Sequence, residues 1–380
     1  MSGRLQYPVT VVGSWPRPAW LLEAMKKRSA NLPELQDQAT LLAIKYQEDA
    51  GVDVISDGEQ RRDNFYSFIS DRLEGIRLMT LAELLDYVED KAAFENLLTA
   101  LDVPAFAIKN PVVVGKVRRR KPLVLDDYRF LREHTRKEIK VTLPGPYLLS
   151  RSMWVKGLSD GIYPDGDGLG DDIVAVLREE LRELADAGVE MVQFDEPVLS
   201  ELLLAGRSAT RTFMCAALAA SSSPEGELER AVILINRVVE GIRGPLLCVH
   251  VCRGNWSRNE DVLLSGPYDG LLPYLNRMNL DQFVLEYATS RAGTPAALAG
   301  LRPGAAIGYG VVNPRTAQIE DPGEIAARVR ELSGIVSPNR IYLNPDCGFG
   351  TFAERPVADA QTAFAKLSAL STAARTLRRD

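Results

Sequence analysis

Eight short apolar runs recur along the 380-residue chain, and each ends in a loop rich in Gly, Pro or Asp. Segments of helical period lie between several of them. Two of these, Leu35–Gly51 and Asp171–Gly188, place Gly just past the last turn, where a left-handed cap costs least. Eightfold alternation of strand and helix predicts an α/β fold, the (β/α)8 TIM barrel. The expected strands are Val9–Ser14, Val52–Asp57, Ile139–Leu143, Val189–Asp195, Leu246–Cys252, Phe283–Glu286, Ala305–Gly310 and Ile341–Pro345.

The segment after the second expected strand, about 66–137, is too long for one crossover. We expect it to hold two amphipathic helices, Leu81–Val88 and Ala92–Leu101, and a β-hairpin-like segment over Ile108–Leu125. No Ser/Gly-rich linker brackets it. The sequence therefore predicts an insertion on one barrel domain that spans residues 1–380, rather than a second domain.

Composition narrows the class of protein. Hydrophobic residues make up 46% and charged residues 25%, as in ordinary globular proteins. A formal charge of −6 argues against a nucleic-acid partner. The one basic cluster, Arg118–Lys121, is expected to be a solvated hairpin tip, with an anion-binding patch as the alternative. The chain has no apolar run long enough for a membrane span or a signal peptide, and only four cysteines, so we expect a cytoplasmic protein without disulfides.

Polar side chains gather where the expected strands end. In a (β/α)8 barrel the carboxyl ends of the strands form one rim, which carries the catalytic groups. A single carboxylate there would read as a member of a surface ion pair, but a set from separate strands indicates a site. The residues concerned are Ser14, Asp57, Glu59, Asp195, Glu196, His250, Cys252, Glu286, Asp346 and Cys347.

His250 and Cys252 are the strongest candidates for metal ligands. They lie two apart in one strand, so their side chains face the same way. A lone His-x-Cys is more often a core Cys beside a buried His. Glu286 and Cys347, at two later strand ends, would complete a four-coordinate zinc site. The remaining candidates are interpreted as structural: His134 in a charged stretch, Cys215 in helix packing and Cys248 in the barrel interior.

The residue types define the chemistry. With one imidazole and two thiolates as firm ligands, the carboxylate is the exchangeable fourth ligand, so its position is open to substrate. A thiol on zinc is deprotonated at neutral pH, and a thiolate-rich zinc suits sulfur alkylation better than hydrolysis. Glu59 and Asp195, as catalytic-site carboxylates, would hold the ammonium of an amino-acid thiol. The backbone amides of Gly13 and Ser14 would hold its carboxylate.

Seven stretches, in order along almost the whole chain, resemble the carboxyl-terminal catalytic barrel of the cobalamin-independent methionine synthases in a short, single-barrel form. The resemblance implies that Zn²⁺ is bound by His250, Cys252, Glu286 and Cys347. It also implies that Ser14, Glu59 and Asp195 hold homocysteine, and that Glu201 stands where a pterin-binding Glu is expected. The stretches are Val12–Pro16, Asp57–Asp63, Asn110–Gly115, Leu143–Pro146, Gln193–Pro197, His250–Cys252 and Asn344–Gly348.

The sequence departs from that family's pattern at the methyl-donor side. Val312 occupies the position of a proton-donating His. Methyl transfer from methyl-tetrahydrofolate needs its N5 protonated by a positioned acid, because an amine anion is a poor leaving group. Either Tyr309 or Asp346 substitutes for the missing His, or the donor is a methylcorrinoid on a partner protein. Two further positions differ: Ser152 stands for an aromatic pterin partner, with Trp154 close by, and Phe106 for an Arg.

The resulting hypothesis is a zinc-dependent S-methyltransferase that converts homocysteine to methionine. Two alternatives remain open. One is another zinc thiol alkyltransferase, such as an epoxyalkane–coenzyme M transferase. The other is a non-catalytic, zinc-stabilised binding barrel.

Overall fold

The structure is a computed structural model, and it describes residues 5–87, 91–92, 95, 99, 109–204 and 223–380. Seven parallel strands form one sheet in the order β1-β4-β5-β6-β7-β8-β9. These strands are β1 (Val54–Ile55), β4 (Glu138–Pro144), β5 (Met191–Asp195), β6 (Leu246–Val251), β7 (Gln282–Glu286), β8 (Ala306–Val312) and β9 (Ile341–Pro345).

The first expected strand closes this sheet into a barrel. Val9 forms a parallel bridge with Leu343 of β9, and Thr10 forms one with Val54 of β1. The backbone NH of Thr10 donates to Leu343 O at 2.9 Å, and the NH of Val54 donates to Val9 O at 3.1 Å. The chain near residues 9–10 thus lies between the two edges of the sheet. The (β/α)8 prediction is confirmed, although this strand is shorter than expected.

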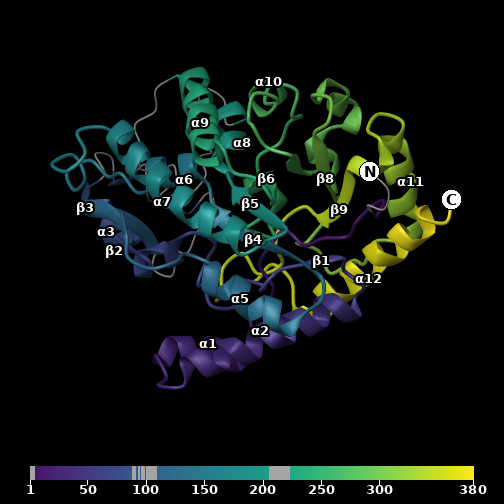
Figure 1. Cartoon of the computed structure of the whole chain (residues 1–380), viewed down its shortest axis with the longest axis horizontal. Helices are drawn as coiled ribbons and strands as arrows, with labels where there is room; N and C mark the ends of the chain where they lie inside the picture. The colour runs from purple at the N-terminus through teal and green to yellow at the C-terminus, as the bar shows by residue number, and fades with distance from the viewer. Residues whose placement is uncertain (1–4, 88–90, 93–94, 96–98, 100–108, 205–222) are drawn as a thin grey trace.

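Helices wrap the barrel in the predicted alternation (Figure 1). Gly51 (φ +81°) follows α2 and Gly188 (φ +86°) follows α7, which confirms the two predicted left-handed caps. Between β7 and β8 the crossover holds only short 3-10 turns. The helices are α1 (Ala19–Lys27), α2 (Leu32–Asp49), α3 (Leu81–Leu84), α5 (Leu125–His134), α6 (Pro146–Ser152), α7 (Gly166–Asp186), α8 (Val198–Leu204), α9 (Pro224–Val239), α10 (Leu272–Leu275), α11 (Pro322–Ser333) and α12 (Ala360–Leu377), with 3-10 turns η1 (Ser67–Asp71), η2 (Leu85–Tyr87), η3 (Glu260–Val262), η4 (Ser290–Ala292), η5 (Pro295–Gly300) and η6 (Pro338–Arg340).

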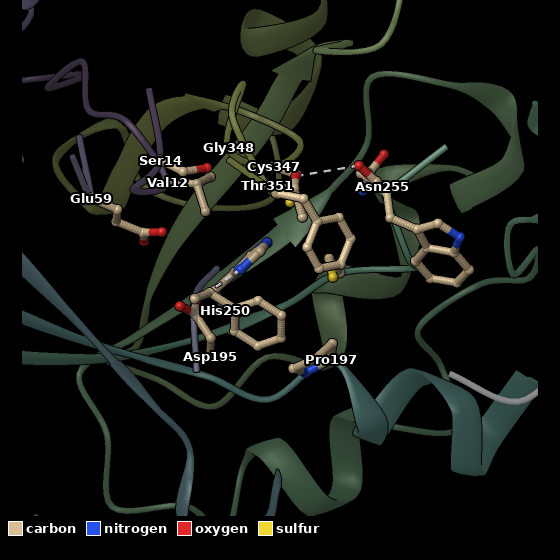
Figure 2. Close-up of a pocket in the computed structure, with 14 residues that line it drawn as sticks. Val12, Ser14, Glu59, Asp195, Pro197, His250, Asn255, Cys347, Gly348 and Thr351 are labelled. Atoms are coloured by element: carbon tan, nitrogen blue, oxygen red, sulfur yellow. Dashed lines mark hydrogen bonds and ion pairs between the residues drawn. The ribbon is translucent and has the colours of Figure 1, made fainter. Parts of the chain in front are cut away.

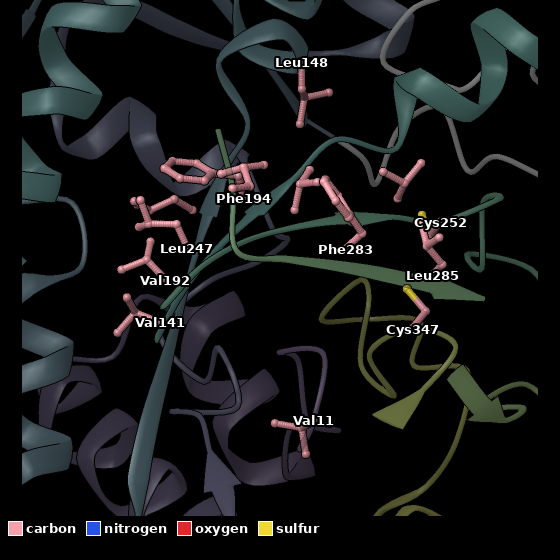
Figure 3. Close-up of a cluster of buried hydrophobic side chains, with 14 of the residues drawn as sticks. Val11, Val141, Leu148, Val192, Phe194, Leu247, Cys252, Phe283, Leu285 and Cys347 are labelled. Atoms are coloured by element: carbon pink, nitrogen blue, oxygen red, sulfur yellow. The ribbon is translucent and has the colours of Figure 1, made fainter. Parts of the chain in front are cut away.

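Two apolar clusters hold the barrel together. The smaller one fills its interior and includes Cys248, as the sequence predicted, with Val12, Val54 and Val284. The larger one packs the outer faces of the strands against the helices and reaches the rim of the barrel. Figure 3 shows Cys252 and Cys347 at one end of this larger cluster. The thiols therefore sit where apolar packing meets the mouth of the barrel.

The expected insertion differs from the prediction in its strand pairing. β2 (Leu73–Thr80) and β3 (Lys109–Arg119) pair with each other in antiparallel fashion, at one side of the molecule in Figure 1. The prediction of a hairpin within residues 108–125 is therefore wrong, because the segment holds the single strand β3, whose partner is the earlier strand β2. Of the two expected helices, the first is only a short α3 followed by η2, and the second falls mostly outside the described residues, as do Cys215 and Phe106.

Three residues of the basic cluster at the end of β3 are exposed, as predicted for a solvated tip: Arg118, Arg120 and Lys121. The Arg119 side chain differs, because it is 6% exposed and forms ion pairs with Glu179, Glu180 and Glu183 of α7. Glu180 also accepts hydrogen bonds from the backbone NH groups at the start of α5. The prediction of a solvated tip is wrong for Arg119, because helix α7 presents three carboxylates to it.

No helix in the described parts of the chain is both long and apolar enough to cross a membrane.

Candidate metal centre

His250, Cys252 and Cys347 come together at the carboxyl ends of two strands. His250 lies in β6, Cys252 directly follows it, and Cys347 lies two residues past β9. One ligand atom from each, an imidazole nitrogen or a thiol sulfur, lies within 4.8 Å of the other two. All three side chains are buried. The sequence placed these residues at strand ends, and the curvature of the barrel brings β6 and β9 close enough for one ion.

The hydrogen bonds of His250 orient its ring. Nδ1 lies 3.0 Å from Asp195 Oδ1, and Nε2 lies 3.3 Å from Asp346 O. A carboxylate at Nδ1 holds the proton there and leaves Nε2 to a metal, which is the usual arrangement of metal-binding histidines. Burial lowers the pKa of His250, but the hydrogen bond to Asp195 and the nearby Cys252 outweigh it and raise the pKa to about 9. Metal binding must therefore displace a proton from this ring.

The two thiols share a hydrogen bond. This bond lowers the pKa of Cys252 and raises the pKa of Cys347, and burial adds to the rise at Cys347. One nitrogen and two sulfur donors suit Zn²⁺. Hard cations such as Mg²⁺ and Ca²⁺ prefer oxygen ligands instead. Three protein ligands with a cavity beside them match a catalytic zinc site, which keeps one position for substrate. The donor set present here fits Zn²⁺.

Glu286 ends β7, as predicted, and is 1% exposed. Its carboxylate is hydrogen-bonded to other residues and is not part of the group formed by His250, Cys252 and Cys347. Oε1 accepts hydrogen bonds from the backbone NH of Arg253 and from Asn255 Nδ2, both at 2.5 Å. Oε2 lies 3.2 Å from Arg291 Nη2. The ligand role of Glu286 thus stays a prediction.

A pocket adjoins His250, Cys252 and Cys347. Figure 2 shows Ser14, Glu59, Asp195, His250 and Cys347 arranged around it. These five and Cys252 were predicted from the sequence. The whole lining consists of Val12, Ser14, Glu59, Phe65, Asp195, Pro197, His250, Cys252, Asn255, Trp256, Cys347, Gly348, Thr351 and Phe352.

The aromatic side chains of the lining were missed by sequence reasoning. Phe65 follows the Asp57–Asp63 motif, Trp256 follows Cys252 by four residues, and Phe352 follows Cys347 by five. Their only signal was proximity to those motifs. With Val12 and Pro197 they give the cavity a large apolar share of its lining.

Glu59 presents a carboxylate to the cavity. It is 2% exposed; Thr142 Oγ1 donates to its Oε1 at 3.0 Å, while Oε2 has no hydrogen-bond partner in the described chain. Burial raises the pKa of Glu59, although Arg62 acts in the opposite direction. A methyl group on Gly13 would come within 2.5 Å of Glu59 Oε1. Gly13 is not among the lining residues named above. Because it has no side chain, it leaves space for the Glu59 carboxylate.

Asp195 is held by a chain of hydrogen bonds that runs into the barrel. Gln193 Nε2 donates to Asp195 Oδ1 at 2.8 Å, and Lys140 Nζ donates to Gln193 Oε1 at 3.1 Å. Lys140 is fully buried, which lowers the pKa of its ammonium to about 8. With the bond from Asp195 to His250, the chain extends from the barrel interior to the metal centre.

The residues considered as replacements for the missing proton donor are not among the described residues that line the cavity. The Tyr309 ring centroid lies 5.3 Å from that of Tyr287, and Tyr309 interacts with Arg328 of α11, so it belongs to the outer layer. Asp346 Oδ1 accepts hydrogen bonds from the backbone NH groups of Tyr287 and Ala288 at 3.0 and 2.9 Å, whereas its Oδ2 has no hydrogen-bond partner in the described chain. Val312 is buried in β8.

Glu201 and Trp154 do not reach the cavity wall as far as the chain is described. Glu201 is buried on α8, and Trp154 Nε1 donates to Tyr163 O at 2.9 Å. The pterin role of Glu201 therefore stays a prediction. His134 is exposed and lies 2.7 Å from Phe130 O through Nδ1, consistent with its structural interpretation.

Comparison with known proteins places this site in a family. Residues 7–223 and 248–375 match the family model "Cobalamin-independent synthase, Catalytic domain". A methionine synthase of Sulfurisphaera tokodaii is 28% identical over 348 residues, which cover 90% of this chain and 85% of that protein. A methionine synthase of Pyrococcus furiosus is 26% identical over 380 residues, covering 98% and 93%.

The fold also matches a solved structure. A B12-independent methionine synthase from Shewanella sp. W3-18-1, in complex with selenomethionine, superposes with a TM-score of 0.75. That likeness covers 98% of both chains at 24% sequence identity. This comparison of the two backbones supports the barrel fold.

Proposed function

The chain belongs to the cobalamin-independent methionine synthase family, and on that premise we propose that it transfers a methyl group to the sulfur of homocysteine and forms methionine. One observation carries the proposal. A nitrogen and two sulfur ligands, within 4.8 Å of one another, border a cavity that also holds two buried carboxylates, Glu59 and Asp195.

His250, Cys252 and Cys347 would hold Zn²⁺, with Glu286 as the exchangeable fourth ligand. When bound, the ion supplies the positive charge that keeps a substrate thiol deprotonated at neutral pH. Asp195 fixes the tautomer of His250 through the 3.0 Å contact at Nδ1. With the His250 imidazole held in this orientation, the three ligands can bind the ion without movement of the strands.

Glu59 and Asp195 bind the ammonium of homocysteine, and Ser14 with the Gly13 backbone binds its carboxylate. The free Oε2 of Glu59 supports the first assignment, because a buried carboxylate oxygen without a donor favours a cation. The same carboxylates disfavour an anionic sulfonate thiol such as coenzyme M. This charge pattern separates the proposal from the epoxyalkane–coenzyme M alternative.

The sulfur attacks the methyl carbon in line with the departing donor, and the new S–C bond forms as the old bond to the methyl breaks. Phe65, Trp256 and Phe352 keep water from the nucleophile and present an apolar surface to the donor. Among the described lining residues, the titratable groups are those already assigned to homocysteine and the metal. This favours a methylcorrinoid, whose cobalt leaves without protonation, over methyl-tetrahydrofolate.

The test is binding followed by turnover. We expect about one Zn²⁺ per chain, homocysteine that binds more tightly than coenzyme M in calorimetric titrations, and methionine formation with methylcobalamin as donor. Parallel assays with mono- and triglutamyl methyl-tetrahydrofolate decide the donor. Bound zinc with no thiol binding would instead identify a non-catalytic zinc-stabilised barrel, and tighter binding of coenzyme M would favour the other alkyltransferase.

A further inference from the structure

Five side chains beside the metal centre form a closed ring of hydrogen bonds, called here the carboxylate ring. Asn255 Nδ2 donates to Glu286 Oε1 at 2.5 Å, and Arg315 Nε donates to Asn255 Oδ1 at 2.8 Å. Arg315 Nη1 lies 2.5 Å from Glu260 Oε1, and Arg291 Nη1 lies 2.7 Å from Glu260 Oε2. Arg291 Nη2, at 3.2 Å from Glu286 Oε2, closes the ring.

The ring joins the loops of three neighbouring strands. Asn255 and Glu260 follow β6, Glu286 and Arg291 end and follow β7, and Arg315 follows β8. The side chains of Glu286, Arg291 and Arg315 are 1%, 8% and 1% exposed. The ring reaches solvent at its fifth member, because the side chain of Glu260 is 52% exposed. It is therefore a network that is buried next to the metal centre and open at its outer end.

The charges of the ring balance without a metal. Two guanidinium groups face two carboxylates, so Glu286 is neutralised where it sits. Its Oε1 accepts a hydrogen bond from the backbone NH of Arg253, the residue next to Cys252. The ring is therefore adjacent to the ligand group but separate from it. The Glu286 carboxylate thus has two possible partners, the side chains of the ring and the metal ion.

We propose that the carboxylate ring is the seat of Glu286 whenever the substrate sulfur occupies the fourth ligand position. Arg291 and Asn255 are then positioning residues that set how readily Glu286 gives up that position. This inference rests on the proposed function, because it needs a zinc centre and a thiol that competes with Glu286. It goes beyond it in naming the residues that control the exchange.

The first test is Arg291→Met, which removes the ring contact to Glu286 and leaves Glu286 itself intact. The zinc dissociation constant of the substrate-free protein should fall about ten-fold, the value of one charge-assisted hydrogen bond. The homocysteine dissociation constant should rise by a similar factor, because the thiol must displace a carboxylate that has lost its alternative partner. Competition with a chromophoric chelator measures the first and calorimetry the second.

Matched variants separate the ring from general damage. Arg258→Met removes an arginine from the loop after β6 that carries Asn255 and Glu260; its Nε donates to Val357 O at 3.0 Å, and its loss should change neither constant. Arg291→Lys keeps a charge but cannot bridge both carboxylates, so its effect should be intermediate. Asn255→Leu, which removes the other side-chain donor to Glu286, should act in the same direction as Arg291→Met.

A double-mutant cycle gives the sharpest outcome. In a Glu286→Gln background, Arg291→Met should leave both constants unchanged, because the carboxylate that the ring seats is gone. Weaker zinc binding in Arg291→Met would overturn the inference, since the ring would then be preparing Glu286 as a ligand. Unchanged constants in Arg291→Met and Asn255→Leu would overturn it as well.

The failure of this inference is distinguishable from failure of the proposed function. If the wild-type protein binds zinc and homocysteine but the ring variants behave like Arg258→Met, only the ring has no role. If the wild-type protein binds no zinc or no homocysteine, the proposed function fails first. Should Arg291→Met not fold, the Asn255→Leu and Arg291→Lys proteins carry the same comparison.

Discussion

The two flanks of the metal centre hold their carboxylates in different ways. On one flank, Asp195 is held by Gln193 and Lys140, residues of β5 and β4 that point into the barrel. On the other, Glu286 is held by Asn255 and Arg291, which lie in loops. The first flank fixes His250, one of the three proposed metal ligands. The second holds a residue whose predicted ligand position must be vacated for substrate.

The difference shows how one barrel rim combines a rigid and an exchangeable side. Strand residues are held by the hydrogen bonds of the sheet, so the Lys140–Gln193–Asp195 chain defines one geometry. Loop residues can rearrange at lower cost, and ligand exchange needs such freedom. If this comparison is right, substitutions on the strand flank weaken metal binding, whereas substitutions on the loop flank redistribute affinity between metal and substrate.

The largest effect is expected from removing a ligand. Cys347→Ser should lose stoichiometric zinc, and methionine formation should fall by at least about 100-fold, because an alcohol is a poor replacement for a thiolate. Metal analysis and activity assays provide the measurement. Cys248→Ala is the matched control and should retain zinc, since Cys248 belongs to the barrel interior, is not one of the three clustered ligands, and its thiol donates to Val192 O at 3.3 Å. Full zinc content in Cys347→Ser would break the assignment of the centre.

A smaller loss, confined to substrate binding, is expected at Glu59. Glu59→Gln should raise the KM for homocysteine about 10- to 100-fold with zinc content unchanged, because the ammonium loses its buried counter-charge. A thiol without an amino group, such as 4-mercaptobutanoate, should bind equally to both proteins. Equal loss for both thiols would show that Glu59 supports the fold of the cavity instead.

The strand flank itself is tested at Lys140. Lys140→Met removes the hydrogen bond that Gln193 Oε1 accepts, so that only the bond from Nε2 to Val12 O still helps to orient the amide that donates to Asp195. We expect zinc affinity to fall about ten-fold, as for other groups that orient metal-binding histidines. Lys140→Gln keeps an NH donor without the charge and should retain more of the affinity. If the two variants lose equally, the orienting role of Lys140 is refuted.

The prediction with the least bearing on the reaction concerns pH. Burial lowers the pKa of Lys140 to about 8 in the folded protein, from 10.5 in the unfolded chain. Between these values the unfolded chain binds more protons, so the free energy of unfolding should rise with pH, by at most about 3 kcal/mol. Chemical denaturation of wild type and Lys140→Met across this range should show the rise only in wild type. Parallel pH curves would refute it.

The sequence predicted the barrel, the three clustered ligands and the two cavity carboxylates because each follows from a local pattern. His250 and Cys252 lie two apart at one strand end, Asp195 ends a strand, and Glu59 and Cys347 follow strand ends within a few residues. Lys140 escaped notice, since a single polar residue within an apolar run carries no local sign of its partner. Its role depends on Gln193, which lies on the neighbouring strand β5 and is distant in the sequence.

The loop flank was not predictable for a related reason. Asn255, Arg291 and Arg315 lie in three loops, and nothing in their spacing indicates that they meet. The position of Glu286 at a strand end was correct, but its partners depend on loop conformation. The hairpin error in the insertion has the same origin, because β2 and β3 pair across a long intervening segment.

The most direct test of the account is X-ray absorption at the zinc edge, recorded on the wild-type protein with and without homocysteine. The substrate-free protein should show two sulfur neighbours together with nitrogen and oxygen. Homocysteine should add a third sulfur and remove an oxygen, as Glu286 leaves. An unchanged sulfur count, with homocysteine bound, would contradict the claim that this centre acts on the substrate thiol.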